Sequence, residues 1–259
     1  MNIDFHVHGL LSKKRAFNEK FFLEEINSAK ESNIEGIALC EHFQAIAFND
    51  IYKYLESNYP YRGDRYLVNG ISIFPSMEVS IKGGGHVILV GEIESIVELH
   101  HRLMGNVEKE NFIEFEELLN LGDRYKCLKI GAHPFRKGQK LFKKPIELLG
   151  RLDVLELNAK DIYKKGEIEV KKNVVSLAEK LNKPIVGGSD SHTALQIGSI
   201  KTSINGQHYK IVDIKRSLDS NCQVKISSSL EFKVFSSKIL KRYLASTVRK
   251  YDNDTSFKI

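Results

Sequence analysis

Two pairs of residue types that bind metal ions stand two positions apart in this sequence. His6 and His8 form the first pair, and Asp190 and His192 form the second. Along an extended strand, side chains at i and i+2 point to the same face, about 6–7 Å apart. Each pair can therefore present two donor atoms to one divalent ion. Because an HxH pair also occurs often by chance, a metal site needs further ligands.

Further imidazole and carboxylate groups follow other apolar segments of the chain. His42, Glu78, His86 and His133 each lie at or beside an expected strand end. A carboxylate such as Glu78, after the apolar run "ISIFPSM", is costly to bury without a positive partner. A metal ion would supply that partner. Mixed nitrogen and oxygen ligands favour Zn, Mn or Fe over Mg or Ca.

The segments that carry these residues alternate between strand and helix patterns. Apolar runs predict strands at 2–8, 34–42, 71–81, 83–91, 127–133, 152–158 and 184–190. Helical periodicity predicts helices at 18–32, 111–125 and 167–181. This alternation favours parallel βα units, in a barrel or an open sheet. Six of the nine histidines fall at strand ends, and in a βα barrel the carboxyl ends of the strands form the catalytic rim.

The order of the motifs resembles one known family. The segments "DFHVH", "CEH", "MEVS", "GGGHVILVG", "GAHPF", "LELN" and "GGSDSH" are similar to those of the polymerase and histidinol phosphatase (PHP) family of metal-dependent phosphoesterases. The likeness covers residues 2 to about 204. It implies an α/β fold, a distorted (β/α)7 TIM-like barrel, with a metal site at the C-terminal rim of the strands.

The resemblance also implies which residues bind two or three divalent metal ions (Zn, Mn or Fe). Carried over by motif, one ion would be held by His6, His8, Glu78 and Asp190. Glu78 would bridge to a second ion held by His86 and His133. His42 and His192 would help to hold a third. Asp190 and His192 are also the residues expected to be catalytic.

The first motif departs from the family pattern. The family usually continues to a serine and then an Asp or His that serves the third metal, whereas this chain has Lys13 or Lys14 there. A protonated lysine cannot ligate a metal. Either the third site is lost, or another residue completes it, or a lysine replaces part of its charge. We favour the three-metal site, with Lys13 as a candidate contact for a substrate phosphate.

The implied chemistry is hydrolysis of a phosphate monoester by metal-activated hydroxide, on a histidinol-phosphate-like or nucleotide substrate. Arg136, just after "GAHPF", could bind a phosphate through its forked guanidinium or form a salt bridge at the rim. Glu41 could support a histidine ligand or be a strand-end charge. Asn158 could contact substrate or cap a turn.

The positive charge is concentrated near the C-terminus. Residues 201–259 contain 12 Lys and Arg against 5 Asp and Glu, which accounts for the whole net charge of +6. We expect residues 1–204 to form the barrel core and residues 205–259 a basic segment that completes it or packs on it. Within 237–250, helical periodicity places an apolar stripe against the domain, with most Lys and Arg opposite. The stripe consists of Ile239, Leu240, Tyr243, Leu244 and Val248.

Other functions remain open. The basic segment supports a nuclease or phosphodiesterase acting on DNA or RNA, although no cluster of aromatic residues accompanies the lysines. A metal amidohydrolase also begins with HxH, but commonly uses a bridging lysine where Glu78 stands here. A non-catalytic metal domain is supported only by Lys13 and Lys14. The expected partner is a phosphorylated small molecule, with nucleic acid as the alternative.

Several classes of protein are excluded or disfavoured. The chain has no run of about 18 apolar residues, so we expect no membrane-spanning helix. Its start has no basic segment before an apolar run, so we expect no signal peptide. Three widely spaced cysteines indicate a reducing compartment. We therefore expect a cytoplasmic protein, whose loops 43–70 and 92–127 select the substrate. We expect the segment 43–70 to overhang the site. Its five tyrosines would either stack on a ring of the substrate or cover the barrel.

Overall fold

A computed structural model describes the backbone of residues 1–254 and the side chains of residues 1–247. Within these residues, ten strands form one sheet in the order β10-β9-β1-β2-β4-β5-β6-β7-β8, with β3 paired to β4. The strands are β1 (Asn2–Val7), β2 (Gly36–His42), β3 (Tyr66–Val68), β4 (Ile71–Ser80), β5 (His86–Val90), β6 (Leu128–Ala132), β7 (Val154–Asn158), β8 (Ile185–Gly188), β9 (Ile200–Ile204) and β10 (Cys222–Ile226).

The sheet closes on itself between its first and last parallel strands. After β8, the backbone N–H of Asp190 donates to the carbonyl of His6 over 2.7 Å, and His8 donates to Ser191 over 3.1 Å. The fold is therefore a distorted βα barrel, as the sequence predicted. Strands β1, β2, β4, β6, β7 and β8 run in one direction, and β5 runs antiparallel to both of its neighbours.

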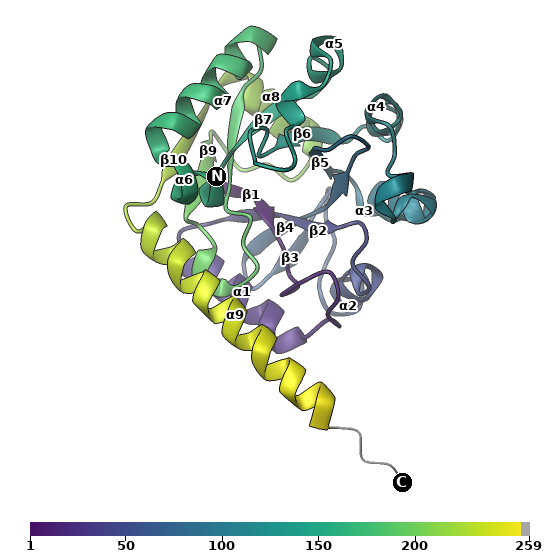
Figure 1. The fold of residues 1–259 in the computed structure, drawn as a ribbon, viewed down its shortest axis with the longest axis vertical. Coiled ribbons are helices and arrows are strands. Elements are labelled where there is room, and N and C mark those ends of the chain that lie inside the picture. Colours follow the sequence, from purple (N-terminus) through teal and green to yellow (C-terminus); the bar gives the residue numbers. More distant parts are fainter. Residues whose placement is uncertain (255–259) are drawn as a thin grey trace.

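Helices surround the barrel (Figure 1). They are α1 (Glu19–Glu31), α2 (Phe48–Asn58), α3 (Ile93–Leu103), α4 (Phe115–Arg124), α5 (Ile146–Leu149), α6 (Ala159–Lys165), α7 (Glu167–Leu181), α8 (Ile211–Ser220) and α9 (Leu230–Asp254). The described residues also contain four short 3-10 turns. These are η1 (Met104–Asn106), η2 (Lys109–Asn111), η3 (Leu141–Lys143) and η4 (Ala194–Gln196). Among the described residues, no helix combines the length and the hydropathy required to cross a membrane.

Alternation along the strands divides the core into two layers. One buried cluster contains Ile3 of β1, Cys40 of β2, Phe74 of β4 and Val186 of β8, and fills the inside of the barrel. The other cluster contains the alternate strand residues, which point outward, and the apolar residues of the helices that pack on them. Because strand side chains alternate, Glu78 shares the inward face of β4 with Phe74. The barrel interior is thus apolar below and polar at the rim.

Two segments expected to be loops contain helices. Residues 43–70 include α2 and the short β3, and α2 buries Phe48, Ile51 and Leu55 in the outer core. Residues 92–127 include α3, which was not predicted, and α4, which lies within the helix predicted at 111–125. His100 of α3 is a core residue, with its Nε2 atom 3.1 Å from the carbonyl of Phe43. The aromatic side chains of 43–70 hid the helical pattern because they occur on both of its faces.

The C-terminal helix α9 packs on α6 and η4 along one side of the barrel (Figure 1). The predicted apolar face agrees with the structure only in part. Leu240 and Leu244 are half-buried, but Ile239 and Tyr243 are 52% and 64% exposed, and Lys241 is half-buried. The buried residues Val234 and Ser237 lie before the first residue of the predicted stripe. The side chains of residues 248–254, which include Val248, and the whole of 255–259 lie outside the described part. Strand β10 pairs antiparallel with β9, so the basic segment adds a strand to the sheet.

Candidate metal centre

A β-bulge turns the two histidines of β1 into the barrel. Between Asp4 and Val7 the chain advances three residues while β2 advances only two, from Ile37 to Leu39. The extra residue reverses the alternation, because one strand then has two residues opposite one. His6 and His8 consequently reach the interior, although Val7 belongs to the outer core. The sequence predicted that His6 and His8 share a face, but no residue in β1 signals the bulge.

Two more site residues depend on unusual backbone conformations. His133, after β6, has φ of 30°, and Asp190, after β8, has φ of 55°. Non-glycine residues in this region cost of order 1–3 kcal/mol and are concentrated at functional sites. The backbone N–H of His133 donates to Glu156 over 2.6 Å. The fold therefore maintains strained backbone at the positions where these side chains turn toward the rim.

The first group of donor atoms forms around the histidines of β1. The Nε2 atoms of His6 and His8 are 3.2 Å apart, and each is 3.7 Å from Oε2 of Glu78. Oδ1 of Asp190 lies 3.5 Å from Nε2 of His8 and 4.0 Å from Nε2 of His6. Two nitrogens and two carboxylate oxygens thus converge on one small volume, and all four residues were predicted ligands.

Glu156 supports this group from below. Its Oε1 atom lies 2.9 Å from Nδ1 of His6, which leaves Nε2 directed at the other donors. A carboxylate behind a histidine ligand fixes the tautomer of the ring and raises its basicity. Gly188 makes room for this contact, because a Cβ atom there would collide with Glu156 and with His6.

The second group lies on the opposite side of Glu78. Its Oε1 atom is 2.6 Å from Nδ1 of His86 and 3.0 Å from Nε2 of His133. His86 reaches the rim because β5 runs antiparallel to β4 after a tight turn in which Gly84 and Gly85 have φ of 93° and 119°. Strands β4 and β5 therefore form a hairpin that brings His86 to the rim. The two oxygens of Glu78 face two separate groups of histidines.

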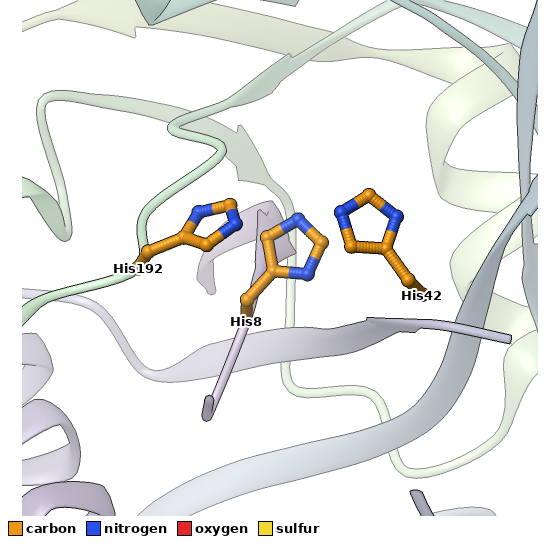
Figure 2. Close-up of side chains that lie close together, drawn as sticks. All are labelled: His8, His42 and His192. Carbon is orange, nitrogen blue, oxygen red and sulfur yellow. The ribbon is translucent and has the colours of Figure 1, made fainter. Parts of the chain in front are cut away.

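The third group consists of His8, His42 and His192, which Figure 2 shows turned toward one another. The ring centroid of His8 lies 4.2 Å from that of His192 and 4.7 Å from that of His42. His8 thus belongs to both the first and the third group.

Burial keeps several of these imidazoles neutral. It lowers the pKa of His8 to about 3, helped by the charges of His42 and His6. The pKa of His133 is lowered by burial and by Arg136, and that of His192 by burial and by Lys160. Neutral imidazole is the form that binds a metal ion. Nδ1 of His8 and Nδ1 of His133 are also buried without a hydrogen-bond partner among the described residues.

The two carboxylates remain ionised for different reasons. Burial alone would raise the pKa of Glu78. The opposite effect of nearby His86, His42 and His6 is larger, and the pKa is well below its usual range. Burial also raises the pKa of Asp190, and Lys160 and Arg136 lower it well below its usual range. Imidazole nitrogens with ionised carboxylate oxygens at these distances form a donor set that fits divalent ions such as Zn, Mn or Fe.

Arg136 lies at the rim in a network of ion pairs. It donates to Asp190 over 2.7 Å, to Asp161 over 3.0 Å and to Asn158 over 2.7 Å. The same Asn158 oxygen accepts from the N–H of Lys160 and so caps α6. Arg136 and Asn158 thereby hold Asp190 relative to the start of α6.

Sequence reasoning missed Lys160. Its ammonium lies 2.8 Å from Oδ1 of Asp190 and 3.2 Å from Nδ1 of His192. Its position two residues after a strand that ends at the rim was the available signal. Lys13 is placed elsewhere: it is exposed and lines a cavity of about 640 Å³ beside α2 and α3 that contains none of the three histidine groups. Glu41 accepts from the N–H of Leu10 over 2.9 Å and lies 3.9 Å from Nδ1 of His8.

Comparisons with known proteins support the resemblance. A family described as PHP-associated (PHP_C) matches residues 172–220, which include most of α7, β8 and α8. A search of curated proteins found no match.

Three solved structures share the fold. PsfC from Pseudomonas syringae PB-5123 is 22% identical, with a TM-score of 0.79 over 94% of this chain and 98% of PsfC. The lesion-specific endonuclease Q from Pyrococcus furiosus is 18% identical, with a TM-score of 0.60 over 87% of this chain and 58% of the endonuclease. An amidohydrolase from Chromobacterium violaceum, with bound sulfate, is 13% identical, with a TM-score of 0.55 over 88% of this chain and 99% of the amidohydrolase.

The PHP-associated match over residues 172–220 agrees with the resemblance to the PHP family, and the solved structures share the barrel fold of this chain. At these identities the solved structures establish the fold alone. The reaction must be argued from the groups at the rim.

Proposed function

We propose that this protein is a metal-dependent phosphoesterase that hydrolyses a phosphate monoester. The observation that carries the proposal is the division of Glu78, whose Oε1 faces His86 and His133 while Oε2 faces His6, His8 and His42. A carboxylate arranged in this way can bridge two cations. Paired cations suit reactions that transfer charge between phosphoryl oxygens.

The three groups of donors would hold two or three divalent ions. His6, His8 and Asp190 would hold one with Oε2 of Glu78, and His86 and His133 would hold another with Oε1. His42 and His192 would hold a third, which has to share His8 with the first. Ions bound there lower the pKa of water toward neutrality and neutralise charge on phosphoryl oxygens. Zn, Mn and Fe are the candidates.

The remaining rim residues prepare the site. Glu156 fixes the ring of His6, so that its Nε2 lone pair points into the group. Arg136 fixes Asp190 through its ion pair, so we assign Arg136 a positioning role and, through its unused N–H groups, a contact with phosphate. His192 and Asp190 lie beside the ammonium group of Lys160.

Hydrolysis of a simple phosphomonoester tests this function. The manganese-loaded protein is assayed with 4-nitrophenyl phosphate and with bis(4-nitrophenyl) phosphate, beside Asp190→Ala and the surface control Asp213→Asn. We expect monoester turnover that Asp190→Ala abolishes, with loss of metal from the first group, and that Asp213→Asn retains. Full activity in Asp190→Ala would refute the assignment. Bound metal with no turnover of either ester would favour a non-catalytic metal domain.

A nuclease is the second candidate. The observation in its favour is the basic helix α9 beside the rim, together with the fold shared with endonuclease Q, which has been solved with a 27-mer duplex that carries an abasic lesion. Preferred turnover of the diester, with salt-sensitive binding of DNA or RNA, would support this candidate. An amidohydrolase is less well supported, because Glu78 rather than a lysine lies between the two groups.

A further inference from the structure

A cavity of about 410 Å³ lies between α6 and α9, directly beside the metal centre. His192 forms part of its wall, so the cavity continues from the third group of histidines. Five of the other ten lining residues are uncharged, namely Tyr163, Gln196, Val234, Ser237 and Ala245. The other five are cationic: Lys160 and Lys164 from α6 and Lys238, Lys241 and Arg242 from α9.

The charges in this cavity are not balanced within the protein. Among the residues whose side chains the structure describes, no carboxylate lines the cavity. Within the same residues, Lys164, Lys238, Lys241 and Arg242 have no ion pair within 4 Å, and Lys160 alone is paired, with Asp190. Lys164, Lys238 and Arg242 are exposed, so water and salt screen their charges, whereas Lys160 and Lys241 are half-buried. A bound anion would reduce the repulsion between these two ammonium groups.

Lys241 is the clearest sign that the arrangement is specific. Burial and the charge of Lys160 lower its pKa to about 8, although Asp190, Glu41 and Glu25 act in the opposite direction. A long helix could easily turn a lysine to solvent and bury an apolar residue instead. On α9, Lys241 is half-buried, as Leu240 and Leu244 are, while Phe232 and Ile239 are 72% and 52% exposed.

We propose that this cavity binds a second anionic group on the substrate, which makes the substrate a small phosphomonoester whose leaving group carries a carboxylate or a second phosphate. This inference rests on the proposed function, since the phosphoryl group to be cleaved would occupy the adjoining metal centre. Lys241 and Lys238 bind the second anion, and Lys160 connects the two sites through its contacts with Asp190 and His192.

The shape of the cavity favours a small molecule over a nucleic acid. Small-ligand pockets commonly enclose about 300–1,000 Å³. Here the cations converge on one concavity of 410 Å³, and Tyr163 is the aromatic residue among those that line it. Proteins that bind single strands instead align cations along a groove with several stacking aromatics.

Binding of two matched phosphonates tests the pocket without turnover, because their C–P bond is not an ester. The manganese-loaded protein is titrated calorimetrically with 3-phosphonopropionate and with propylphosphonate, which differ in a carboxylate. We expect at least a tenfold preference for 3-phosphonopropionate, equivalent to about 1.4 kcal/mol. It should fall below threefold in Lys241→Gln, fall partly in Lys238→Gln, and persist in Lys225→Gln, an exposed lysine on β10 that does not line the cavity.

Equal affinities for the two phosphonates, or a preference that survives Lys241→Gln, would overturn the inference. So would displacement of 3-phosphonopropionate by a short oligonucleotide whose own binding depends on Lys241, because the pocket would then serve a nucleic acid. Parallel hydrolysis of 4-nitrophenyl phosphate separates the two proposals. Turnover without the preference removes only the pocket, and the preference without turnover removes only the phosphoesterase.

Discussion

The two central carboxylates of the rim are neutralised in different ways. Glu78 is surrounded by imidazoles, at 2.6 Å from His86, 2.9 Å from His42 and 3.0 Å from His133. Asp190 contacts Arg136 and Lys160, at 2.7 Å and 2.8 Å. An imidazole carries a charge only when it holds a proton, whereas guanidinium and ammonium groups remain charged at neutral pH.

This difference indicates which part of the site depends on metal ions. Glu78 is buried and its neighbours can exchange protons for a metal ion, so its negative charge is best balanced when metal is bound. Asp190 is balanced by the protein itself and can hold its position without metal. The Glu78 side would therefore be the metal-dependent half of the rim, and the Asp190 side the preorganised half.

Removal of the bridging charge should have the largest effect. We expect Glu78→Gln to lose ions from both the first and the second group and to lower monoester turnover by at least about 10³-fold, since paired ions contribute several kcal/mol to transition-state stabilisation. Metal analysis of the purified variant, together with its turnover rate, checks this. Normal metal content in Glu78→Gln would show that Glu78 does not bridge.

Stability without metal should separate the two carboxylates. In chelator-treated protein, we expect Asp190→Asn to lose about 3 kcal/mol, because it leaves Arg136 and Lys160 partly buried beside a neutral group. Glu78→Gln should lose less, because the histidines around it can release their protons when the carboxylate is removed, whereas Arg136 and Lys160 stay charged. Urea unfolding followed by circular dichroism measures both losses. Equal losses in the two variants would refute the distinction.

A positioning residue should have a smaller effect than a ligand. Arg136→Lys cannot reproduce contacts with Asp190, Asp161 and Asn158 together, because lysine has a single point charge. We expect a loss of about 10–100-fold in turnover, as for other residues that orient metal ligands. Metal content should stay near that of the parent, unlike in Glu78→Gln. Unchanged turnover would limit Arg136 to a structural salt bridge.

The smallest expected effect is the pH dependence of anion binding at Lys241, in the cavity beside the rim. Lys241 is charged below its pKa of about 8 and neutral above it, in a surrounding that includes Lys160, His192, Asp190, Glu41 and Glu25. The affinity for 3-phosphonopropionate should therefore fall a few-fold between pH 7 and pH 9, whereas that for propylphosphonate should change less. Calorimetry at both pH values checks this, with Lys241→Gln as the pH-insensitive control.

The sequence predicted the barrel and the eight candidate ligands because both depend on local patterns. Strand-end histidines and carboxylates can be read from alternation and spacing, and these residues do meet at the rim. The bulge in β1 and the positive φ angles of His133 and Asp190 could not be predicted, since the closed barrel imposes them. Lys160 and Lys241 were missed because their roles depend on how α6 and α9 pack.

The orientation of α9 illustrates the same limit. Its sequence predicts an apolar stripe on the protein side, in which Leu240 and Leu244 are half-buried. Ile239 and Tyr243 of that stripe are exposed, however, while Lys241 is half-buried. Periodicity identifies a helix and its possible faces. Which face is buried depends on the surface that the helix meets, and here that surface adjoins the metal centre.

The bridging role of Glu78 can be observed most directly by anomalous diffraction from crystals of the manganese-loaded protein. We predict one ion among His6, His8 and Asp190 and another between His86 and His133, each bound to a different oxygen of Glu78. Crystals of Glu78→Gln should lack both peaks. Manganese bound elsewhere, or Glu78 still paired only with histidines at saturating manganese, would contradict the account.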